Sequence, residues 1–385
     1  MTASERDPLL SHRAEFPALG GSIYLVSHSL GAMPRAAEAA LGEFTRLWVE
    51  EGINAWSRWL PMVTEAGNRI ARLLGADAGS VVMLPNVSTA EAVVASCLDF
   101  TGPRNGVVYP ELEFPTVSYV WKAEERRGAR VTLVPSDDGI GVPTERMCAA
   151  IDERTSIVPL SHVLFRSAYV QDVAAITRRA HEVGALVCVD LYQSLGTVPV
   201  DVKQWDVDFA CGGSVKWLCG GPGAGYLYVR PDLLPRLEPR VTGWFGHAEP
   251  FAFRMPAQEY AAGTWRMLGG TPAVASLYHA RPGAEIVAAI GVEAIRAKSL
   301  RQTARIVDAV DAAGFVLSSP RDGARRGGSV CFDFPGAAAV TEELNRRKLF
   351  CDHRPGAGIR VSPHFYTTDD EIDAFFAETR ALARS

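Results

Sequence analysis

The sequence predicts an α/β protein with a mostly parallel sheet in a large domain and a small α+β domain at the C-terminal end. Three observations lead to this fold class. The chain has 385 residues, which at roughly 150 residues per domain fits two or three domains, or one large and one small. Between residues 81 and 229 short apolar runs alternate with helical patterns, as in parallel sheets that helices cover on both faces. Beyond residue 282 one long helical pattern precedes two further strand-like runs.

These patterns divide the chain into three parts. Residues 1–15 are predicted to form a polar N-terminal arm, and residues 16–255 the large domain. Residues 256–385 are predicted to form a linker helix and the small domain, to which the N-terminal segment could also contribute.

The individual elements follow from their apolar spacing. Residues 35–49 and 61–74 are predicted as helices, the second because Val63, Ile70 and Leu74 share one face. Short apolar runs predict seven strands, at 81–84, 106–108, 130–134, 157–160, 185–190, 207–211 and 225–229. Helical spacing between these runs predicts helices at 88–97, 118–127, 144–151 and 173–183. After a break at 256–282 we expect one long helix at 285–313 and strands at 329–334 and 358–362.

Composition and charge argue against several classes of protein. The formal net charge of −5 disfavours nucleic acid or an anionic membrane as the main partner, because both attract basic surfaces. No apolar run reaches the roughly 20 residues that span a bilayer, and residues 1–16 contain no apolar signal segment. The seven cysteines form no CxxC pair and the eight histidines show no paired ligand spacing. We therefore expect reduced thiols, no metal site and a cytoplasmic location.

Two residues after predicted strands could bind a cofactor ring. Ligands of open α/β sheets bind at the carboxyl ends of the strands, and Asp190 ends one such strand. Its carboxylate could hold a protonated ring nitrogen, or it could simply cap a helix. Lys216 lies among small and apolar residues, so burial would lower its pKa and supply the neutral amine that Schiff-base chemistry needs. The alternative for Lys216 is a side chain that extends from a glycine-rich loop into solvent.

Two further features suit a phosphate and an aromatic ring. Residues 86–89, with sequence Asn-Val-Ser-Thr, immediately precede a helical pattern, and free N–H groups with hydroxyls at a helix N-terminus bind phosphate; plain N-capping is the alternative. Phe114 stands at a strand-to-helix turn, where it could cover a ring or belong to the core. A phosphate cradle, a ring cover, a carboxylate and a lysine together describe a site for pyridoxal 5′-phosphate (PLP).

Motifs around these residues extend over most of the chain. They include Glu113-Phe114-Pro115-Thr116, Ser161-His162-Val163, Lys216 with Gly220-Gly221-Pro222-Gly223, Gly243-Trp244-Phe245-Gly246-His247 and Arg360-Val361-Ser362-Pro363. From about residue 20 to its end the chain resembles the class V aminotransferase-fold PLP enzymes, of fold type I, and most of all kynureninase. Residues 243–247 are the part of this resemblance that is most specific to the family. The resemblance as a whole implies the PLP-dependent transferase fold.

The resemblance also implies the cofactor contacts. Lys216 would carry PLP as a Schiff base and move protons, and Asp190 would bind the pyridinium proton. Phe114 would stack on the ring, and Gln193 would lie near its 3′-oxygen. The phosphate would be held by Val87, Ser88 and Ser214.

Substrate and partner contacts are implied in the same way. Arg360 would bind the α-carboxylate of an amino-acid substrate as a bidentate pair, with His28 and Ser29 nearby. Trp244 and Thr271 would reach the cofactor of a second subunit, which implies a homodimer with a shared active site.

Several residues depart from the kynureninase pattern. Val215 replaces a Tyr that touches the phosphate and helps proton transfer, and Val117 replaces an Asp. His28 stands where kynureninases have Asn, Leu164 where they have Asn or Gln, and Gln193 where they have His. Hydrolysis of a Cβ–Cγ bond needs water activation and proton transfer, so the loss of Tyr at 215 weakens the kynureninase interpretation.

The sequence therefore favours a PLP-dependent lyase that acts at the Cβ substituent of an L-amino acid. A cysteine S-conjugate suits such an enzyme, because a thiolate leaves without help from an acid. Kynureninase, which hydrolyses kynurenine to anthranilate and alanine, is the first alternative. Another class V reaction, such as transamination or decarboxylating oxidation, and a non-catalytic binding protein are the others.

Overall fold

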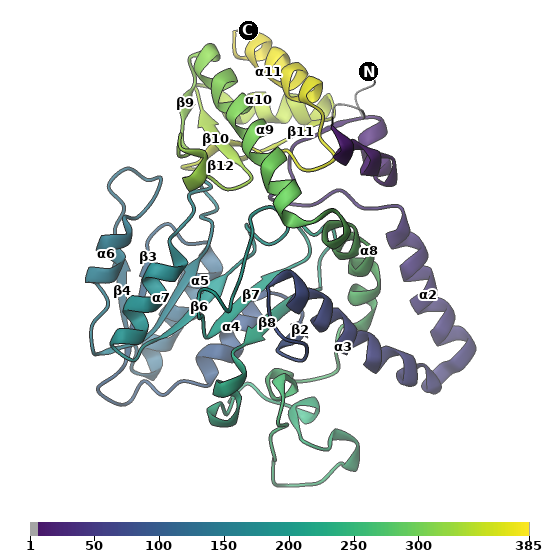
Figure 1. Ribbon diagram of the computed structural model, residues 1–385, viewed down its shortest axis with the longest axis vertical. Helices are drawn as coiled ribbons and strands as arrows, with labels where there is room; N and C mark the ends of the chain where they lie inside the picture. Colours follow the sequence, from purple (N-terminus) through teal and green to yellow (C-terminus); the bar gives the residue numbers. More distant parts are fainter. Residues whose placement is uncertain (1–6, 385) are drawn as a thin grey trace.

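A seven-stranded sheet forms the centre of the computed structural model, which describes residues 7–384 (Figure 1). Its strand order is β2 (Val81–Leu84), β8 (Gly225–Val229), β7 (Phe209–Gly213), β6 (Leu186–Asp190), β5 (Thr155–Ser161), β3 (Gly106–Pro110) and β4 (Arg130–Val134). The strands from β7 to β4 are parallel, whereas β8 is antiparallel to both its neighbours. The sheet is mixed and mostly parallel, as predicted.

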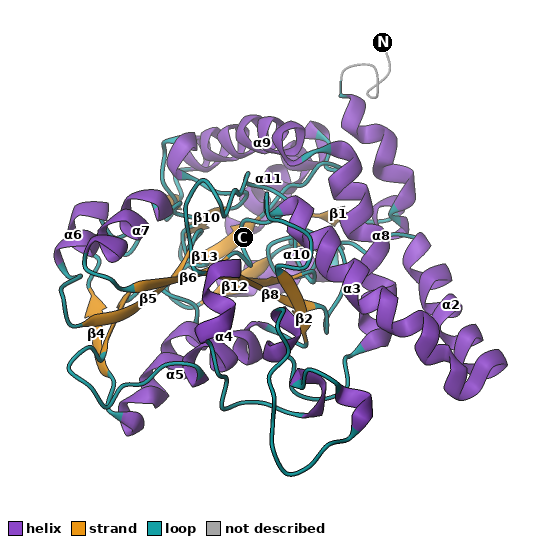
Figure 2. Cartoon of the chain, turned by 60° about the horizontal axis from the view of Figure 1, so that its bottom comes forward, coloured by secondary structure: helices purple, strands orange, loops and turns teal. Residues whose placement is uncertain are grey.

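Helices cover both faces of this sheet. Figure 2 shows α4 (Val87–Ser96) and α5 (Pro115–Ala123) on one face, and α6 (Thr144–Ala149) and α7 (Val173–Glu182) on the other. Successive residues of β5 divide between the two faces: Ile157 packs with the core under α4 and α5, and Val158 with the opposite core. Helices α2 (Ala36–Glu51), α3 (Trp56–Leu73) and α8 (Val274–Ile290) extend the second layer.

The small domain contains a four-stranded antiparallel sheet. Its strand order is β12 (Asp352–Arg354), β13 (Gly358–Val361), β10 (Val330–Asp333) and β9 (Val316–Leu317). Helices α9 (Val292–Ala313), α10 (Ala337–Arg346) and α11 (Asp369–Ala383) pack on it. The N-terminal strand β1 (Ile23–Tyr24) pairs in parallel with β11 (Leu349–Phe350), so the N-terminal segment lies against this domain.

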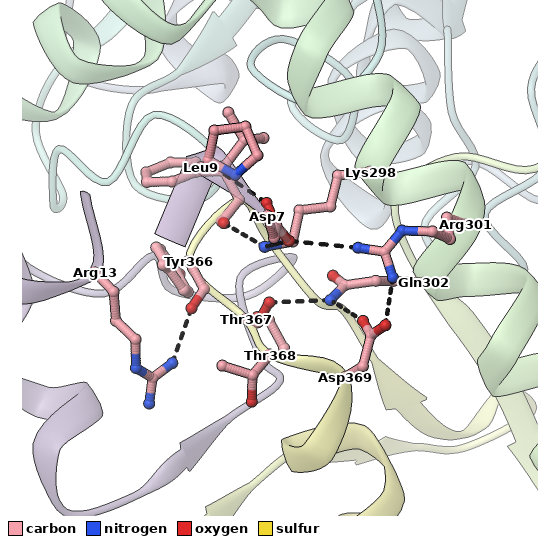
Figure 3. Close-up of polar contacts among 12 residues, drawn as sticks. Asp7, Leu9, Arg13, Lys298, Arg301, Gln302, Tyr366, Thr367, Thr368 and Asp369 are labelled. Atoms are coloured by element: carbon pink, nitrogen blue, oxygen red, sulfur yellow. Dashed lines mark hydrogen bonds and ion pairs between the residues drawn. The ribbon is translucent and has the colours of Figure 1, made fainter. Parts of the chain in front are cut away.

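Residues 7–20 are fixed to the small domain by charges and hydrogen bonds (Figure 3). They form the short 3₁₀ helices η1 (Pro8–Glu15) and η2 (Pro17–Gly20). The Asp7 carboxylate lies 2.8 Å from Lys298 Nζ and 3.3 Å from Arg301 Nη2, and Arg13 Nη1 donates to the Tyr366 carbonyl at 2.8 Å. Residues 1–6 of the predicted arm lie outside the described residues.

Several predicted helices have different bounds in the structure. The helix expected at 61–74 is α3, which begins at Trp56 and includes Pro61. The helix expected at 285–313 is two helices, α8 and α9, because Gly291 has a φ of +86° that no helix accommodates. The helix expected at 118–127 begins at Pro115 and continues after α5 as the 3₁₀ helix η4 (Glu124–Arg127), since proline is favoured in a first helical turn.

The connection from β8 to α8 is long and projects from the large domain at the bottom of Figure 1. It contains four 3₁₀ helices, η5 (Pro231–Arg236), η6 (Trp244–Gly246), η7 (Pro250–Ala252) and η8 (Thr264–Met267). Two further 3₁₀ helices lie elsewhere in the chain: η3 (Gly52–Ala55) precedes α3, and η9 (Gly323–Arg325) follows β9. Within residues 7–384 no helix combines the length and the apolar character that a membrane crossing requires.

Candidate active site

The carboxyl ends of the parallel strands surround a cavity of about 250 Å³. Ser161 ends β5 directly opposite Asp190, which ends β6, and Lys216 follows the end of β7 by three residues. The cavity is lined by Asn86, Val87, Ser88, Phe114, Thr116, Ser161, Val163, Phe165, Asp190, Tyr192, Gln193, Val215 and Lys216. It therefore lies where open α/β sheets bind their ligands.

Lys216 extends between two aromatic rings of the cavity. Its Nζ lies 4.4 Å from the centre of the Tyr192 ring and 5.6 Å from that of Phe114. Burial lowers the pKa of Lys216 to about 8, although the nearby Asp190 carboxylate opposes this shift. A lysine with such a pKa supplies much more neutral amine near neutral pH than an ordinary lysine does.

Asp190 is a buried carboxylate at the floor of the cavity. One of its oxygens, Oδ1, accepts the Tyr192 backbone N–H at 2.7 Å. Burial raises the pKa of Asp190 to about 6, while that hydrogen bond and Lys216 act in the opposite direction. The group is thus mostly ionised at neutral pH, and it can accept a hydrogen bond from a protonated ring nitrogen.

The N-terminus of α4 forms one end of the cavity. Asn86 caps the helix, because its Oδ1 accepts the Thr89 N–H at 2.9 Å, so the capping alternative is also correct. The first N–H groups of a helix have no partner within it, and here they belong to the cavity-lining Val87 and Ser88. The Ser88 hydroxyl lies 3.0 Å from that of Thr116, which adds two hydroxyls to a site suited to phosphate.

Phe114 and Gln193 are placed on the cavity walls. The Phe114 side chain is 43% exposed, so it is not a core residue. Its ring packs edge to face with that of Phe165, with the ring centres 5.1 Å apart. The Gln193 amide is held at both ends: its Nε2 donates to the His28 carbonyl at 3.1 Å and its Oε1 accepts from Trp217 Nε1 at 3.3 Å. A flat ring in this cavity would have Phe114 on one side and a fixed amide beside it.

Comparison with known proteins decides the family. The family model described as Aminotransferase class-V matches residues 49–375. The chain belongs to the class V aminotransferase family. The family is PLP-dependent, and the cavity offers this cofactor a lysine, a carboxylate, the aromatic ring of Phe114 and a helix N-terminus. The chain is therefore a PLP-dependent enzyme of this family, as the resemblance implied.

Similar proteins include both studied and uncharacterised members of the family. The uncharacterised aminotransferase YcbU of Bacillus subtilis (strain 168) is 33% identical over 380 residues, covering 96% of this chain and 97% of that protein. The kynureninase of Pseudomonas fluorescens is 33% identical over 384 residues, covering 95% of this chain and 90% of that protein.

Among solved structures, the cysteine desulfurase of Thermococcus onnurineus NA1 superposes with a TM-score of 0.88 at 20% identity, over 97% of this chain and 98% of that one. The cystine C–S lyase C-DES, in complex with cysteine persulfide, gives 0.86 at 21% identity, over 95% and 99% of the two chains. These two likenesses show the fold.

Six predicted site residues of this class V enzyme do not line the cavity, and four of them belong to no cluster beside it. Ser214 is buried, and its hydroxyl donates to the Ala224 carbonyl at 3.2 Å. Ser29 is half-buried in the turn after Val26, whose carbonyl accepts its N–H at 2.9 Å. Trp244 is 40% exposed and Thr271 is exposed, both in the long connection before α8. The structure thus does not bring these four residues to the cavity of their own chain.

Arg360 and His28 form a separate buried cluster beside the cavity. Arg360 donates from Nε and Nη2 to the two oxygens of Asp352, at 2.8 and 2.6 Å. Asp352 Oδ1 also lies 2.9 Å from His28 Nε2. Phe165 connects this cluster to the cavity, because its ring lines the cavity and its carbonyl accepts Arg360 Nη1 at 2.9 Å.

Tyr192 and Ser161 have no predicted cofactor contact, yet both line the cavity. The Tyr192 ring has room only because residue 213 is glycine: a Cβ on Gly213 would lie 2.7 Å from Cε2 of the ring. Ser161 is held by the buried Glu113, which accepts its N–H at 2.8 Å and its hydroxyl. Their positions at or just after the ends of parallel strands are the sequence signal that could have identified them.

Within residues 7–384 no cluster of three or more His, Cys, Asp or Glu side chains could hold a metal ion.

Proposed function

We propose that the protein is a PLP-dependent lyase that cleaves the bond between Cβ of an L-amino acid and its substituent, with a cysteine S-conjugate as substrate. One observation carries the proposal: the residue before Lys216, where kynureninases have a proton-transferring Tyr, is Val215, and it lines the cavity together with Val163 and Phe165. This apolar wall provides no proton for a carbon leaving group. A thiolate needs none, because it is stable as an anion.

The residues of the chain divide the reaction between them. Bound PLP supplies a conjugated ring that accepts the electron pair freed at Cα. The Lys216 amine takes the α-proton, which its lowered pKa of about 8 allows at neutral pH. Asp190 would hold a proton on the ring nitrogen of the bound cofactor. Once the α-proton is removed, a cysteine S-conjugate would lose its sulfur as a thiolate that keeps the bonding pair of the Cβ–S bond. With one water consumed, the final products would be the thiol, pyruvate and ammonium.

Kynureninase activity is the second candidate, because Tyr192 brings a phenol to the cavity. The ring face of Tyr192 is turned towards Lys216 Nζ, at 4.4 Å, while its hydroxyl end lies against Gly213. Burial raises the pKa of Tyr192 to about 12, which makes it a weak acid. His28 offers no alternative donor, since it is 1% exposed and both ring nitrogens are within hydrogen-bond distance of Asp352 or Ser362. These contacts favour the lyase.

A homodimer with a shared active site is part of the proposal. Trp244 lies away from the cavity of its own chain, in a connection that also exposes Phe251, Phe253 and Met255. Trp244 stacks on Phe253 with ring centres 5.9 Å apart. An exposed aromatic group of this kind is typical of a protein–protein contact, and a second copy would cover it.

The deciding experiment scores released products from a panel of S-substituted cysteines, from kynurenine and from unsubstituted amino acids. We expect pyruvate and a thiol from the S-conjugates, and little anthranilate from kynurenine. Anthranilate without pyruvate would replace the lyase with kynureninase. A keto acid that retains its substituent would indicate transamination, and a purified protein that binds no PLP would indicate a non-catalytic role.

A matched pair of variants at residue 215 sharpens this test. Val215→Tyr restores the hydroxyl that kynureninases have, and Val215→Phe adds the same ring without it. We expect the Tyr variant alone to gain anthranilate formation, because the added hydroxyl can donate a proton beside Lys216. Equal activity of the two variants on kynurenine would contradict this explanation of the substrate choice.

A further inference from the structure

Arg360, the arginine expected to bind the substrate carboxylate, already forms an ion pair with a carboxylate of its own chain. Asp352 and Arg360 are directly opposite each other on the antiparallel strands β12 and β13. The guanidinium uses its side-on edge: Nε donates to Oδ1 at 2.8 Å and Nη2 to Oδ2 at 2.6 Å. Both residues of the pair belong to one hairpin. The ion pair therefore does not depend on the arrangement of the large domain relative to the small domain.

The guanidinium still has donors to spare. Arginine carries five N–H groups, of which Asp352 takes two and the Phe165 carbonyl takes one, on Nη1 at 2.9 Å. The remaining two belong to Nη1 and Nη2. A second carboxylate can therefore bind Arg360 without displacing Asp352. Phe165 connects Arg360 to the cavity, because its carbonyl accepts from Arg360 and the same residue lines the cavity.

Asp352 is itself held firmly. His28 Nε2 lies 2.9 Å from its Oδ1, and the other ring nitrogen of His28, Nδ1, lies 2.7 Å from Ser362 Oγ. Burial lowers the pKa of His28 to about 4, so the ring is neutral at neutral pH; it donates from Nε2 to Asp352 and accepts the Ser362 hydroxyl at Nδ1. Arg354 Nη2 adds an ion pair to Asp352 at 3.0 Å.

Asp352 remains an anion in this setting. Its own burial acts to raise the pKa, but hydrogen bonds from His28 and Arg360 hold the pKa well below its usual range. A half-buried charge with three partners, two of them buried, is costly to move. It is therefore suited to holding Arg360 in one orientation, and poorly suited to giving way each time a substrate arrives.

We propose that Asp352 is a positioning residue that fixes Arg360 by its side-on edge, so that the Nη1 and Nη2 groups receive the α-carboxylate of the amino-acid substrate. The inference rests on the proposed function only in requiring an amino-acid substrate. The opposite possibility is that Asp352 occupies Arg360 as a competitor, which a substrate must displace. The two differ in sign, because removing a competitor strengthens carboxylate binding.

The test uses the PLP-loaded enzyme and two amines that differ only by a carboxylate, L-alanine and ethylamine. Each is titrated against the absorbance of the bound cofactor, and the ratio of the two dissociation constants measures carboxylate recognition. In Asp352→Asn we expect the preference for L-alanine to fall at least about tenfold, with ethylamine binding unchanged, since a misoriented fork loses about one charge-assisted hydrogen bond. Tighter L-alanine binding, or an unchanged ratio, would overturn the proposal.

Controls separate this role from general damage to the fold. Asp311→Asn removes an exposed carboxylate that pairs with Arg321 and should leave the ratio as in wild type. Asp352→Glu keeps the charge, and serves if Asn destabilises the hairpin; it should lower the ratio less than Asn does, and an increase would count against the proposal.

A double-mutant cycle tests whether the two residues act together. Arg360→Lys keeps one charge but loses the fork, so it should lower the ratio as well. Combining it with Asp352→Asn should add little, because both changes remove the same oriented edge; additive losses would contradict the positioning role. None of these measurements needs lyase turnover, so a fall in the ratio without pyruvate formation would support the role of Asp352 and reject the lyase.

Discussion

Raising the pH from 7 to 9 is expected to increase the reactivity of the Lys216 amine in the PLP-free enzyme by only about tenfold. Burial lowers the pKa of Lys216 from an ordinary value of 10.5 to about 8. With a pKa of 8 the neutral fraction rises from about 9% at pH 7 to about 91% at pH 9, whereas with 10.5 it rises about a hundredfold, from about 0.03% to about 3%. The logarithm of the rate should therefore bend near pH 8.

The assay is competitive labelling by acetic anhydride, with the Lys216 peptide quantified by mass spectrometry at each pH. Free Nα-acetyl-lysine in the same tube is the internal control, because its rate should keep rising with unit slope beyond pH 9. Asp190→Asn provides the second arm. The Asp190 carboxylate raises the pKa of Lys216, so its removal should shift the bend to lower pH.

Two results would refute this reasoning. A rate that rises with unit slope through pH 10 would mean that burial does not lower the pKa of Lys216. A bend that moves to higher pH in Asp190→Asn would mean that the carboxylate does not stabilise the charged amine. The same shift has a consequence for folding: between pH 8 and 10.5 the unfolded chain binds the Lys216 proton more strongly than the folded chain, so this group makes the free energy of unfolding rise with pH in that window.

Four further substitutions, at Gly213, Glu91 and Gly291, test the packing of the fold. Gly213→Ala should weaken PLP retention in equilibrium dialysis and cost about 1–3 kcal/mol in denaturant unfolding, because its Cβ would lie 2.7–2.9 Å from three atoms of Tyr192; unchanged retention would mean that this ring does not contact the cofactor. Glu91, whose pKa burial raises well above its usual range, accepts Trp121 Nε1 at 2.9 Å. Glu91→Gln should therefore change the free energy of unfolding by less than about 1 kcal/mol, but Glu91→Ala should lower it by about 2–3 kcal/mol. Gly291→Ala should lower the melting temperature, since its φ of +86° strains any other residue by about 1–3 kcal/mol, and an unchanged melting temperature would contradict that.

The strands of the central sheet were predictable because a local run of apolar residues indicates each position. Most of its strands are short runs buried on both faces, as in β5, where all seven residues are buried. The edge strand β4 is the exception, because Val134 is its one buried residue. The two-residue strands β1 and β11 carry no such signal. They exist because Ile23 pairs with Leu349, and nothing near either residue indicates a partner so far along the chain. Tertiary pairing decided these strands, not local propensity.

The candidate site was predictable where one strand end or helix end supplies the residue. Asp190, Lys216, Ser88 and Phe114 all line the cavity, and each follows directly from a local pattern. Ser214 could not be placed in this way, because the orientation of one side chain decides whether it faces the cavity or the Ala224 carbonyl.

Arg360 shows why chemistry alone was insufficient. Its residue type suits a carboxylate, but the sequence does not reveal that Asp352, eight positions earlier, faces it across a hairpin. Contacts of this kind depend on strand register, which a single sequence fixes poorly when strands are short.

The charges around Lys216 would connect the proposed carboxylate contact at Arg360 to the proposed proton transfer at Lys216. Asp190 and Asp352 raise the pKa of this amine, whereas Arg360 and Arg354 lower it. Because Asp352 is bound to Arg360, the hairpin presents a nearly neutral pair to Lys216, and burial dominates its pKa. A substrate carboxylate on the free edge of Arg360 would add one negative charge to this balance. It would favour the ammonium form of Lys216, and so make the amine a stronger base when an α-proton is present to be taken. An amine without a carboxylate would bind without this increase. Carboxylate recognition by Arg360 and proton abstraction by Lys216 would then be coupled through charge alone.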